Sequence, residues 1–257
     1  MLYQIKQYIK FILNSSNQHG VHSPFVYDLV TKCFYDKTKY RGYQAIQNYR
    51  KSLLENPTKI KVTDLGAGSQ VMKHKARSVS DIAKNAGTTH HRAKLMLRLT
   101  RYFKPHHVLE LGTSLGIGTH ALSLGNPEAY ITSIEGCPNT ASYTKKQLEG
   151  TTSQRIKIIT GAFNEQISQL TANHYNLIFF DGNHQKEATL QYFETLLKTA
   201  DNDSIFIFDD IYWSQGMQDA WETIKAHPKV TVTIDTFFWG FVFFRKEQVK
   251  EHFKIRL

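Results

Sequence analysis

From residue 106 to residue 246, short apolar runs alternate with segments of helical spacing. Apolar runs without strict alternation are typical of strands buried on both faces of a parallel sheet. The last two runs are joined through Thr236 alone, which is too short for a crossover helix, so they should pair antiparallel as a hairpin. The pattern predicts an α/β fold with a doubly wound sheet of seven strands. The runs are 106–112, 129–136, 155–162, 174–182, 203–210, 229–235 and 237–246.

Residues 1–104 read as mainly helical. Ser23 followed by Pro24 predicts a helix start, Ser80 is a plausible N-cap, and residues 90–103 have helical spacing. We therefore predict a basic helical extension over residues 1–78 and a second domain over 79–257. A first apolar stripe shares one helix face, and we expect it to be packed core or a dimer contact rather than a membrane anchor. Its members are Leu2, Ile5, Ile9, Ile12 and Leu13.

The charge is unevenly spread along the 257 residues. Residues 1–104 hold 19 Lys and Arg against 5 Asp and Glu, a net charge of +14, whereas the remainder holds 13 against 17, a net charge of −4. The basic part could contact phosphates or an anionic substrate, or could simply be a solvated surface. Two cysteines, Cys33 and Cys137, are too few for a disulfide framework. With no apolar run long enough to span a membrane and no signal peptide pattern, the cytoplasm is the expected location.

A glycine cluster follows the first predicted strand, in the stretch LELGTSLGIG. Its spacing is G-x-x-x-G-x-G and not the G-x-G-x-x-G expected for dinucleotide binding, which disfavours NAD. Glu135 ends the next strand, where a carboxylate can accept hydrogen bonds from both ribose hydroxyls of an adenosine. Glu110 is a second carboxylate beside the glycine turn, able to hold backbone amides or a cationic amino-acid group. Two carboxylates would repel a phosphate but suit a sulfonium-bearing nucleoside, which indicates S-adenosylmethionine.

Two other interpretations compete for this cluster. Residues 62–70 form a second glycine-rich stretch, but its basic sequel favours a polar loop. Gly112 to Gly116 also fits G-x-S-x-G, which would make Ser114 the nucleophile of a serine hydrolase, with Asp209 and His227 completing the triad in chain order. The hydrolase interpretation leaves Glu135 without a role.

The ordered set LELGTSLGIG, SIEGCP, TGAFNE, FFDGNH and FDDIYW resembles the class I S-adenosylmethionine-dependent methyltransferases over roughly residues 78–246. Within that class the chain is similar to the metal-dependent O-methyltransferases of the catechol type. The D-G-x-H of residues 181–184 is closer to certain macrolide-sugar O-methyltransferases. The resemblance implies a Rossmann-like sheet of strand order 3-2-1-4-5-7-6 with the last strand antiparallel. The N-terminal HGVHSPF has no assigned role.

The resemblance also implies which residues would hold the cofactor. The glycine turn would lie along the methionine part of the cofactor, and Glu135 at the ribose. Ala162 and Phe163, where the third predicted strand ends, would flank the adenine. The residues expected to bind the cofactor are Glu110, Gly112, Ser114, Gly116, Glu135, Ala162, Phe163 and Asp181.

Three carboxylates end the fourth and fifth strands: Asp181, Asp209 and Asp210. The carboxyl ends of parallel strands share one sheet edge, so these groups would repel one another unless a cation such as Mg²⁺ lies between them. Such a metal would lower the pKa of a substrate hydroxyl, and the imidazole of His184 could take its proton. Catechol-type enzymes typically carry Asn in place of Asp210 and Lys in place of His184, whereas His184 agrees with the sugar-modifying branch. Alternatively, Asp181 and Asp209 only bind cofactor or substrate and Asp210 caps the next loop.

Three classes of function stay open. The first is O-methylation of a small hydroxylated molecule, with the acceptor lying in an apolar pocket among Tyr212, Trp213, Trp221 and Trp239. The second is methylation of RNA gripped by the basic N-terminal region, which lacks a recognisable RNA-binding motif. The third is a binding module without catalysis. A monomer and a homodimer built on the N-terminal helix are both compatible with the sequence.

Overall fold

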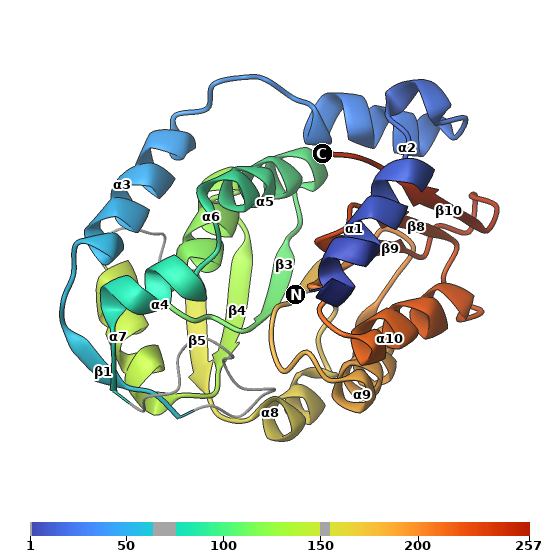
Figure 1. Cartoon of the computed structure of the whole chain (residues 1–257). Coiled ribbons are helices and arrows are strands. Elements are labelled where there is room, and N and C mark those ends of the chain that lie inside the picture. The colour runs from blue at the N-terminus through green and yellow to red at the C-terminus, as the bar shows by residue number, and fades with distance from the viewer. Residues whose placement is uncertain (1, 64–75, 150–154) are drawn as a thin grey trace. The chain divides into compact units, whose positions relative to one another are not determined.

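The computed structural model of the chain describes residues 2–63, 76–149 and 155–257 (Figure 1). These residues form two compact units. Unit 1 comprises Met1–Tyr35 and Ile167–Leu257, and unit 2 comprises Asp36–Gln166. The domain boundary expected near residue 78 stays a prediction, and the second glycine-rich stretch, residues 62–70, lies outside the described residues from position 64 to its end.

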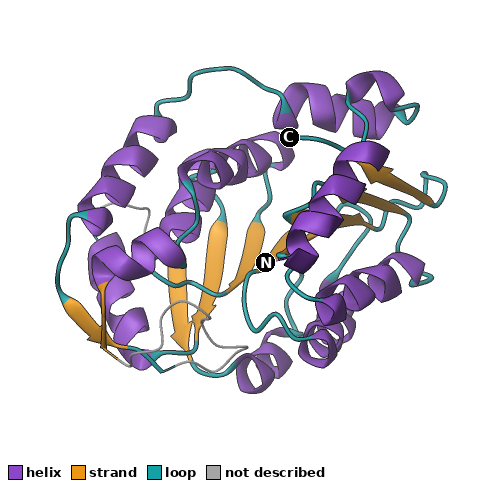
Figure 2. Cartoon of the chain, viewed as in Figure 1, coloured by secondary structure: helices purple, strands orange, loops and turns teal. Residues whose placement is uncertain are grey.

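Unit 2 is built on three parallel strands in the order β3-β4-β5, joined by helices (Figure 2). Helices α3, α4, α5 and α6 pack against one another, while α7 packs against β4 and β5. A short antiparallel pair, β1 with β2, was not expected. The elements are α3 (Gly42–Leu54), β1 (Lys59–Lys61), β2 (Ala76–Ser78), α4 (Val79–Asn85), α5 (His90–Phe103), β3 (His107–Leu111), α6 (Ile117–Gly125), β4 (Tyr130–Glu135), α7 (Pro138–Leu148), β5 (Ile156–Thr160) and α8 (Phe163–Leu170), the last of which continues into unit 1.

Capping side chains fix the starts of the helices in unit 2. Thr89 caps α5, since its Oγ1 accepts from the backbone N–H of Arg92 at 3.3 Å. The expected cap Ser80 is wrong by two residues: Ser78 caps α4, with its Oγ accepting from the N–H of Asp81 at 3.0 Å. Ser78 stands three residues before Asp81, and its hydroxyl also donates to the carboxylate of Asp81 at 2.6 Å, so the helix begins two residues earlier than predicted.

Unit 1 carries five strands in the order β10-β8-β9-β7-β6. Strands β6 and β7 are parallel, and β8 and β9 form the expected antiparallel hairpin, with β9 lying between β7 and β8. The additional strand β10 pairs parallel with β8. The elements are α1 (Leu2–Asn14), η1 (Gln18–Gly20), α2 (Pro24–Leu29), η2 (Val30–Phe34), β6 (Leu177–Phe180), α9 (Lys186–Leu196), η3 (Leu197–Thr199), β7 (Ile205–Asp209), α10 (Gln215–Ala226), β8 (Val232–Asp235), β9 (Trp239–Phe243) and β10 (Glu251–Lys254).

All seven predicted strands are present, as β3 to β9. The order within unit 2 is 3-2-1 and within unit 1 is 4-5-7-6 in the predicted numbering, so the predicted Rossmann-like α/β class is confirmed. Strand β10 escaped prediction because its sequence, EHFK, has one buried residue, Phe253, and no apolar run.

The HGVHSPF segment has a structural role in unit 1. Ser23 caps α2, as predicted, and its hydroxyl also donates to Oε1 of Gln248 at 3.1 Å. The ring of Phe25 packs edge-on against Phe243 of β9, with centroids 5.0 Å apart, and Arg245 lies over its other face. The segment therefore fastens the N-terminal helices to the C-terminal strands.

The two ends of the described chain also pair directly. The backbone N–H of Ser16 donates to the carbonyl of Lys254 at 2.9 Å, and the N–H of Arg256 returns to the carbonyl of Ser16 at 3.1 Å. The hydroxyl of Tyr35 donates to the carbonyl of Arg256 at 2.5 Å. Unit 1 is thus closed by contacts between its two separate chain segments.

The apolar stripe of α1 is not packed core. The buried side chains of this helix are Gln7 and Phe11, whereas Leu2, Ile9 and Leu13 are exposed. The expectation of a packed stripe is therefore wrong for this helix, because the helix turns its other face to the unit. Among the described residues, no helix combines the length and apolarity needed to cross a membrane.

Candidate active site

Three residues of the loop between β3 and α6 adopt left-handed backbone conformations. Their φ angles are +113° at Gly112, +48° at Ser114 and +75° at Gly116. Glycine adopts these angles without strain, whereas a serine in this region is uncommon and is held by its surroundings. The N–H groups of Gly112 and Thr113 both donate to the carbonyl of Ile134, at 3.0 and 3.2 Å. The loop is thereby tied to the end of β4.

Close packing explains the other glycines of the G-x-x-x-G-x-G pattern. A Cβ atom at Gly116 would lie 2.7 Å from Cγ2 of Thr144 on α7. A Cβ atom at Gly118 would lie 2.7 Å from Oε1 of Glu110 on β3. Both distances are shorter than real Cβ contacts allow, so α6 can approach the strand and α7 this closely only through glycine.

Glu135 holds the glycine loop from the neighbouring strand. Its Oε2 accepts from the N–H of Ser114 at 2.8 Å, and its Oε1 accepts from the N–H of Cys137 at 2.8 Å. An ionised carboxylate has about four acceptor sites, so Glu135 can bind backbone and hydroxyl donors together. The arrangement is compatible with a ribose at Glu135, which stays a prediction.

Glu110 is buried beneath the loop, with 1% of its surface exposed. Its Oε2 accepts from the hydroxyls of Thr119 and Ser133, at 2.5 and 2.6 Å. Burial raises the pKa of Glu110 to about 7, although the two hydroxyl donors act in the opposite direction. Glu110 therefore supports the loop through a hydroxyl network, and its direct contact with a cofactor stays a prediction.

The predicted adenine-flanking residues follow β5. The N–H of Gly161 donates to the backbone carbonyl of Glu135 at 3.0 Å, and the carbonyl of Ala162 accepts from Gln166 in the first turn of α8. Ala162 and Phe163 are both partly exposed. The predicted cofactor residues of unit 2 thus lie at the carboxyl ends of β3, β4 and β5, the edge at which parallel α/β sheets bind ligands.

Asp181 and His184 lie together after β6 in unit 1. Nε2 of His184 is 3.9 Å from Oδ1 of Asp181, and both side chains are about one quarter exposed, at 23% and 27%. The backbone bends sharply here, with φ of +70° at Asn183 and +43° at His184. Two consecutive non-glycine residues in this region are strained, and such strain is concentrated at functional sites. Nδ2 of Asn183 donates to the hydroxyl of Tyr192 at 3.0 Å, which secures the bend on α9.

Asp209 and Asp210 lie at the end of β7. Phe180 of β6 is the register partner of Phe208 of β7, so the following residues, Asp181 and Asp209, end adjacent parallel strands. Asp209 is 6% exposed, and its Oδ1 accepts from the N–H of Asp210 at 2.8 Å. Asp210 has a φ of +53°, and its side chain lines a pocket.

The three carboxylates do not form the expected metal site. Within residues 2–63, 76–149 and 155–257, no group of three or more His, Cys, Asp and Glu side chains is placed to hold an ion. Oδ1 of Asp209 binds the backbone of its neighbour, and Asp210 lies among aromatic rings. The ligand set for Mg²⁺ is therefore not assembled, and we derive no step of a reaction through a metal.

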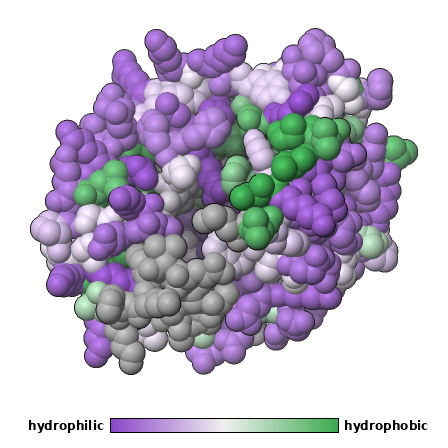
Figure 3. All heavy atoms as spheres, viewed as in Figure 1, coloured by the Kyte–Doolittle hydropathy of each residue, from purple (hydrophilic) through white to green (hydrophobic). Residues whose placement is uncertain are grey.

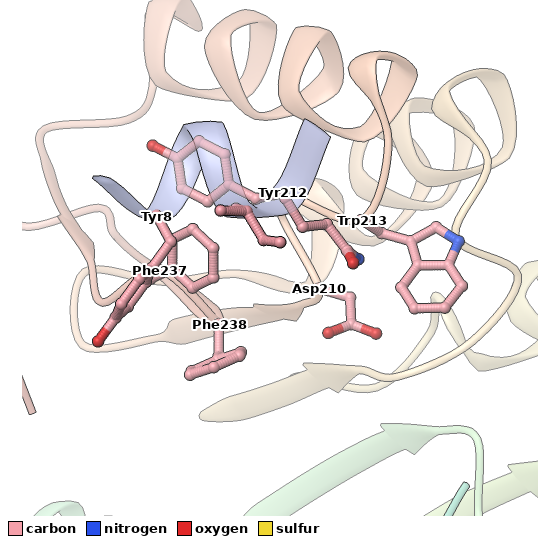
Figure 4. A pocket seen from close by; sticks show the side chains of 8 residues that line it. Tyr8, Asp210, Tyr212, Trp213, Phe237 and Phe238 are labelled. Carbon is pink, nitrogen blue, oxygen red and sulfur yellow. The ribbon is translucent and has the colours of Figure 1, made fainter. Parts of the chain in front are cut away.

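A pocket of about 390 Å³ opens beside Asp210 in unit 1 (Figure 4). This volume is in the range of small-molecule sites. Apart from Gln4 and Asp210 its lining is apolar or aromatic, and Figure 4 shows the carboxylate of Asp210 lying between Phe238 and Trp213. The ring of Trp213 lies 6.4 Å from that of His184, centroid to centroid. The lining residues are Gln4, Ile5, Tyr8, Asp210, Tyr212, Trp213, Phe237 and Phe238.

Asp235, which sequence analysis missed, fixes the aromatic wall of this pocket. Its Oδ2 accepts from the hydroxyl of Tyr212 at 2.6 Å and its Oδ1 from the N–H of Phe237 at 2.8 Å. The rings of Tyr212 and Phe237 consequently stack, with centroids 5.0 Å apart and planes 14° from parallel. Burial raises the pKa of Asp235. Of the four aromatic residues predicted for a pocket, Tyr212 and Trp213 line it, whereas Trp221 and Trp239 are buried in the core.

The structure gives the hydrolase interpretation no triad acid for His227. Nε2 of His227 lies 3.7 Å from Oε1 of Glu194, and its Nδ1 accepts from the N–H of Lys229. A triad histidine requires an orienting carboxylate on one nitrogen and the nucleophile on the other. At the end of α10 the two ring nitrogens of His227 thus face Glu194 and the backbone of Lys229.

Comparison with known proteins identifies the domain. Residues 109–211 match the family model of a methyltransferase domain. This part of the chain is therefore similar to a methyltransferase domain. The matched range starts in β3 and ends just after β7, so it holds the glycine loop, Glu135, Asp181, His184 and Asp209. No curated protein sequence is significantly similar to the chain.

Solved structures show the same fold. A methyltransferase of Podospora anserina bound to S-adenosylhomocysteine matches with a TM-score of 0.62 and 14% identity, over 88% of this chain and 97% of that one. An O-methyltransferase of Streptomyces achromogenes involved in tomaymycin synthesis, bound to S-adenosylmethionine, matches with a TM-score of 0.58 and 13% identity, over 84% and 96%. An O-methyltransferase of Bacillus cereus bound to S-adenosylhomocysteine gives 0.54 and 17%, over 80% and 92%. The methyltransferase fold predicted from the motifs is confirmed.

Proposed function

We propose that the protein transfers the methyl group of S-adenosylmethionine to a hydroxyl oxygen of a small, largely apolar molecule. The observation that carries this proposal is the glycine loop held by Glu135 at the carboxyl ends of β3 and β4. The structural neighbours bound to S-adenosylmethionine or its demethylated product support the choice of cofactor, and the description of several as O-methyltransferases supports the acceptor atom.

The cofactor half of the site is assigned to unit 2. Glu135 ends β4 beside the glycine loop, where its carboxylate holds the N–H groups of Ser114 and Cys137 and would accept the ribose hydroxyls. The turn through Gly112 and Gly116 presents backbone at the strand ends, and the side chains of Ala162 and Phe163 offer a partly exposed apolar surface for a base. No phosphate has to be accommodated beside the two carboxylates, which agrees with a nucleoside lacking phosphate.

The acceptor half is assigned to unit 1. Its pocket is lined by aromatic rings and one carboxylate, Asp210, which can accept a hydrogen bond from the acceptor. His184 stands next to the pocket-lining Trp213 and would receive the hydroxyl proton, while Asp181 at 3.9 Å would stabilise the resulting imidazolium.

The chemistry of the step is a displacement at carbon. S-adenosylmethionine, when bound, supplies an electrophilic methyl group on a sulfonium. The acceptor oxygen forms the new bond to the methyl carbon, the electron pair of the broken bond stays on sulfur, and the proton goes to His184. The chain's contribution is positioning and exclusion of water, because the sulfonium itself is a strong electrophile.

Metal assistance, the finer part of the sequence prediction, is left outside this mechanism, because Asp181, Asp209 and Asp210 do not converge. Turnover measured after dialysis against EDTA, with and without added Mg²⁺, tests this directly. We expect less than a twofold difference. A loss of activity restored by Mg²⁺ would show that the three carboxylates gather around an ion during the reaction.

Two further parts of the proposal concern partners and location. RNA as the acceptor is the alternative, and the apolar lining of the pocket favours a small molecule over it.

We place the protein in a reducing cytoplasm, and its two cysteines, Cys33 and Cys137, are buried and form no disulfide.

Calorimetric titration with S-adenosylhomocysteine tests the cofactor assignment. We expect micromolar binding that Glu135→Ala weakens at least a hundredfold, because the variant loses both the ribose acceptor and the group that holds Ser114. The control is Glu128→Ala, which removes an exposed carboxylate that pairs with Arg155. This variant should bind S-adenosylhomocysteine as the wild type does. Folded protein that binds no S-adenosylhomocysteine would overturn the proposal. Transfer of labelled methyl to a panel of hydroxylated aromatic compounds, sugars and tRNA then identifies the acceptor class.

A further inference from the structure

Helix α1 carries an outward apolar surface. Five large apolar or aromatic side chains on this helix are well exposed. Figure 3 shows a green, hydrophobic patch over α1. Monomeric proteins seldom leave a contiguous apolar patch of this kind in water without a use for it. The exposed fractions are 86% for Leu2, 50% for Ile5, 46% for Tyr8, 55% for Ile9 and 78% for Leu13.

The helix is anchored through its opposite face, so the exposed surface is a stable feature of unit 1. The hydroxyl of Tyr3 donates to Oε1 of Gln218 on α10 at 2.5 Å. The ring of the buried Phe11 packs against Phe237, with centroids 5.7 Å apart, and Tyr8 at the edge of the exposed surface also touches Phe237, with centroids 4.9 Å apart. Gln7 is buried on the same side. These contacts hold the stripe pointing away from the strands of the unit.

The charges on α1 are all positive. Lys6 and Lys10 are exposed, and the helix LYQIKQYIKFILN contains no acidic residue. Helical spacing places the two lysines along the border of the stripe, Lys6 four residues from Leu2 and Lys10 three residues from Leu13. Lysine side chains at such a border can lay their methylene groups on an apolar surface while the ammonium groups reach headgroup phosphates.

We propose that α1 docks the protein on an anionic lipid surface, with the stripe in the headgroup boundary and Lys6 and Lys10 on the phosphates. A second copy of the chain fits the same stripe less well. A two-fold interface presents the same patch from both partners, so the lysines of both helices would meet in one contact without a carboxylate from either helix. An interfacial helix with apolar residues on one side and lysines beside them has the chemistry of a surface-bound amphipathic helix.

The exposed surface of α1 and the pocket share two residues. Ile5 and Tyr8 line the pocket beside Asp210 and are also exposed on α1. An apolar acceptor dissolved in the lipid would therefore reach the pocket along α1. Docking itself does not depend on which acceptor, or which cofactor, the pocket serves.

Vesicle co-sedimentation of the full chain tests the proposal. We expect the protein to sediment with vesicles of phosphatidylcholine and phosphatidylglycerol, and at least tenfold less with phosphatidylcholine alone. The double variant Ile9→Gln, Leu13→Gln should weaken binding to both kinds of vesicle at least tenfold. The double variant Lys6→Gln, Lys10→Gln should abolish the preference for vesicles that contain phosphatidylglycerol. Neither pair lines the pocket, so S-adenosylhomocysteine binding should be unchanged and reports folding independently.

Matched controls use other exposed side chains of unit 1. Val249→Gln removes an apolar residue that is 78% exposed, and Lys229→Gln with Lys246→Gln removes two exposed charges. Both controls should sediment like the wild type. No sedimentation of the wild type with anionic vesicles would overturn the proposal. So would a wild-type dimer in sedimentation velocity that Ile9→Gln with Leu13→Gln converts to monomer, since the stripe would then be covered by a second copy.

Discussion

The carboxyl ends of the strands carry different chemistry in the two compact units. In unit 2 the strand ends are held by hydrogen bonds. The N–H of Ser114 donates to Glu135, the N–H of Gly112 donates to the carbonyl of Ile134, and hydroxyl groups donate to the buried Glu110. In unit 1 the same position in the strands leads to a pocket of aromatic rings, closed on one side by a helix from the other end of the chain.

The difference teaches how the strand ends of each unit are specified. The glycine loop of unit 2 is held mainly by hydrogen bonds to its backbone from neighbouring strand ends. The pocket of unit 1 is assembled from side chains of α1, the turn after β7 and the turn before β9, which are distant in sequence. Under the proposed function, we infer that substitutions in unit 2 act mainly on cofactor affinity and stability, and those in unit 1 on turnover and acceptor choice.

The largest expected effect belongs to unit 1. His184→Gln removes the proposed proton acceptor and should lower kcat by roughly a hundredfold to ten-thousandfold, with the affinity for S-adenosylhomocysteine unchanged. The pH–rate profile should lose its acidic limb. His174→Gln, at an exposed position of the same unit, is the control. An unchanged kcat would remove His184 from the mechanism.

Glu110 should make unit 2 sensitive to pH. The pKa of Glu110 is about 7 in the folded protein, against 4.5 for the unperturbed side chain. Between these pH values the folded state binds more protons than the unfolded state. The free energy of unfolding therefore falls as the pH rises through this range. At about 1.4 kcal/mol per pH unit the loss can reach about 3 kcal/mol. Glu110→Gln should abolish this part of the slope, measured by urea unfolding at pH 5 and pH 8. Glu149→Gln, an exposed carboxylate, should leave it intact.

Two glycines allow the units to be compared by one substitution. Gly118→Ala brings a Cβ atom to 2.7 Å from Oε1 of Glu110 and should cost about 1 to 3 kcal/mol, with weaker cofactor binding. Gly216→Ala on α10 meets nothing closer than 3.5 Å and should stabilise the protein by up to about 1 kcal/mol. Thermal unfolding of both variants is the measurement. Equal destabilisation would contradict the packing argument.

The smallest effect is expected from the aromatic wall. Tyr212→Phe leaves Oδ2 of the buried Asp235 without its hydroxyl donor, at a cost of about 1 to 2 kcal/mol. The KM for the acceptor should rise severalfold because the stacked ring loses its anchor, while S-adenosylhomocysteine binding stays constant. Tyr27→Phe, at an exposed position, should change neither quantity. A weaker cofactor affinity in Tyr212→Phe would show that the two halves are coupled.

The sequence was informative where one local pattern determines the structure. Short apolar runs separated by helical segments predicted every strand from β3 to β9, because each strand is a continuous run of mainly apolar residues. The glycine spacing gave the turn at Gly112 and Gly116, because left-handed φ angles and close helix packing both demand glycine there. Ser114 was assigned to the loop, but its own strained backbone could not be read from its residue type.

Tertiary packing explains what was missed. Asp235 reads as the last residue of a strand, and only the antiparallel turn brings Tyr212 and Phe237 to its two oxygens. The apolar spacing of α1 predicts an amphipathic helix correctly but cannot say which face meets the protein, since the buried Phe11 is as apolar as the exposed residues. The three strand-end aspartates looked like metal ligands, but the described residues contain no cluster of three such side chains placed to hold an ion.

The pairing of Ser16 with Lys254 and Arg256 affects the order in which the protein folds during its synthesis. Unit 2 is one unbroken stretch, whereas unit 1 needs both the first residues and the last. At roughly 5 to 20 residues per second, a ribosome needs on the order of 10 to 45 s to add the chain beyond Tyr35. Helix α1 spends that interval without the strands it packs on, so unit 2 should fold first. The aromatic pocket can then form only when synthesis has reached the C-terminal strands.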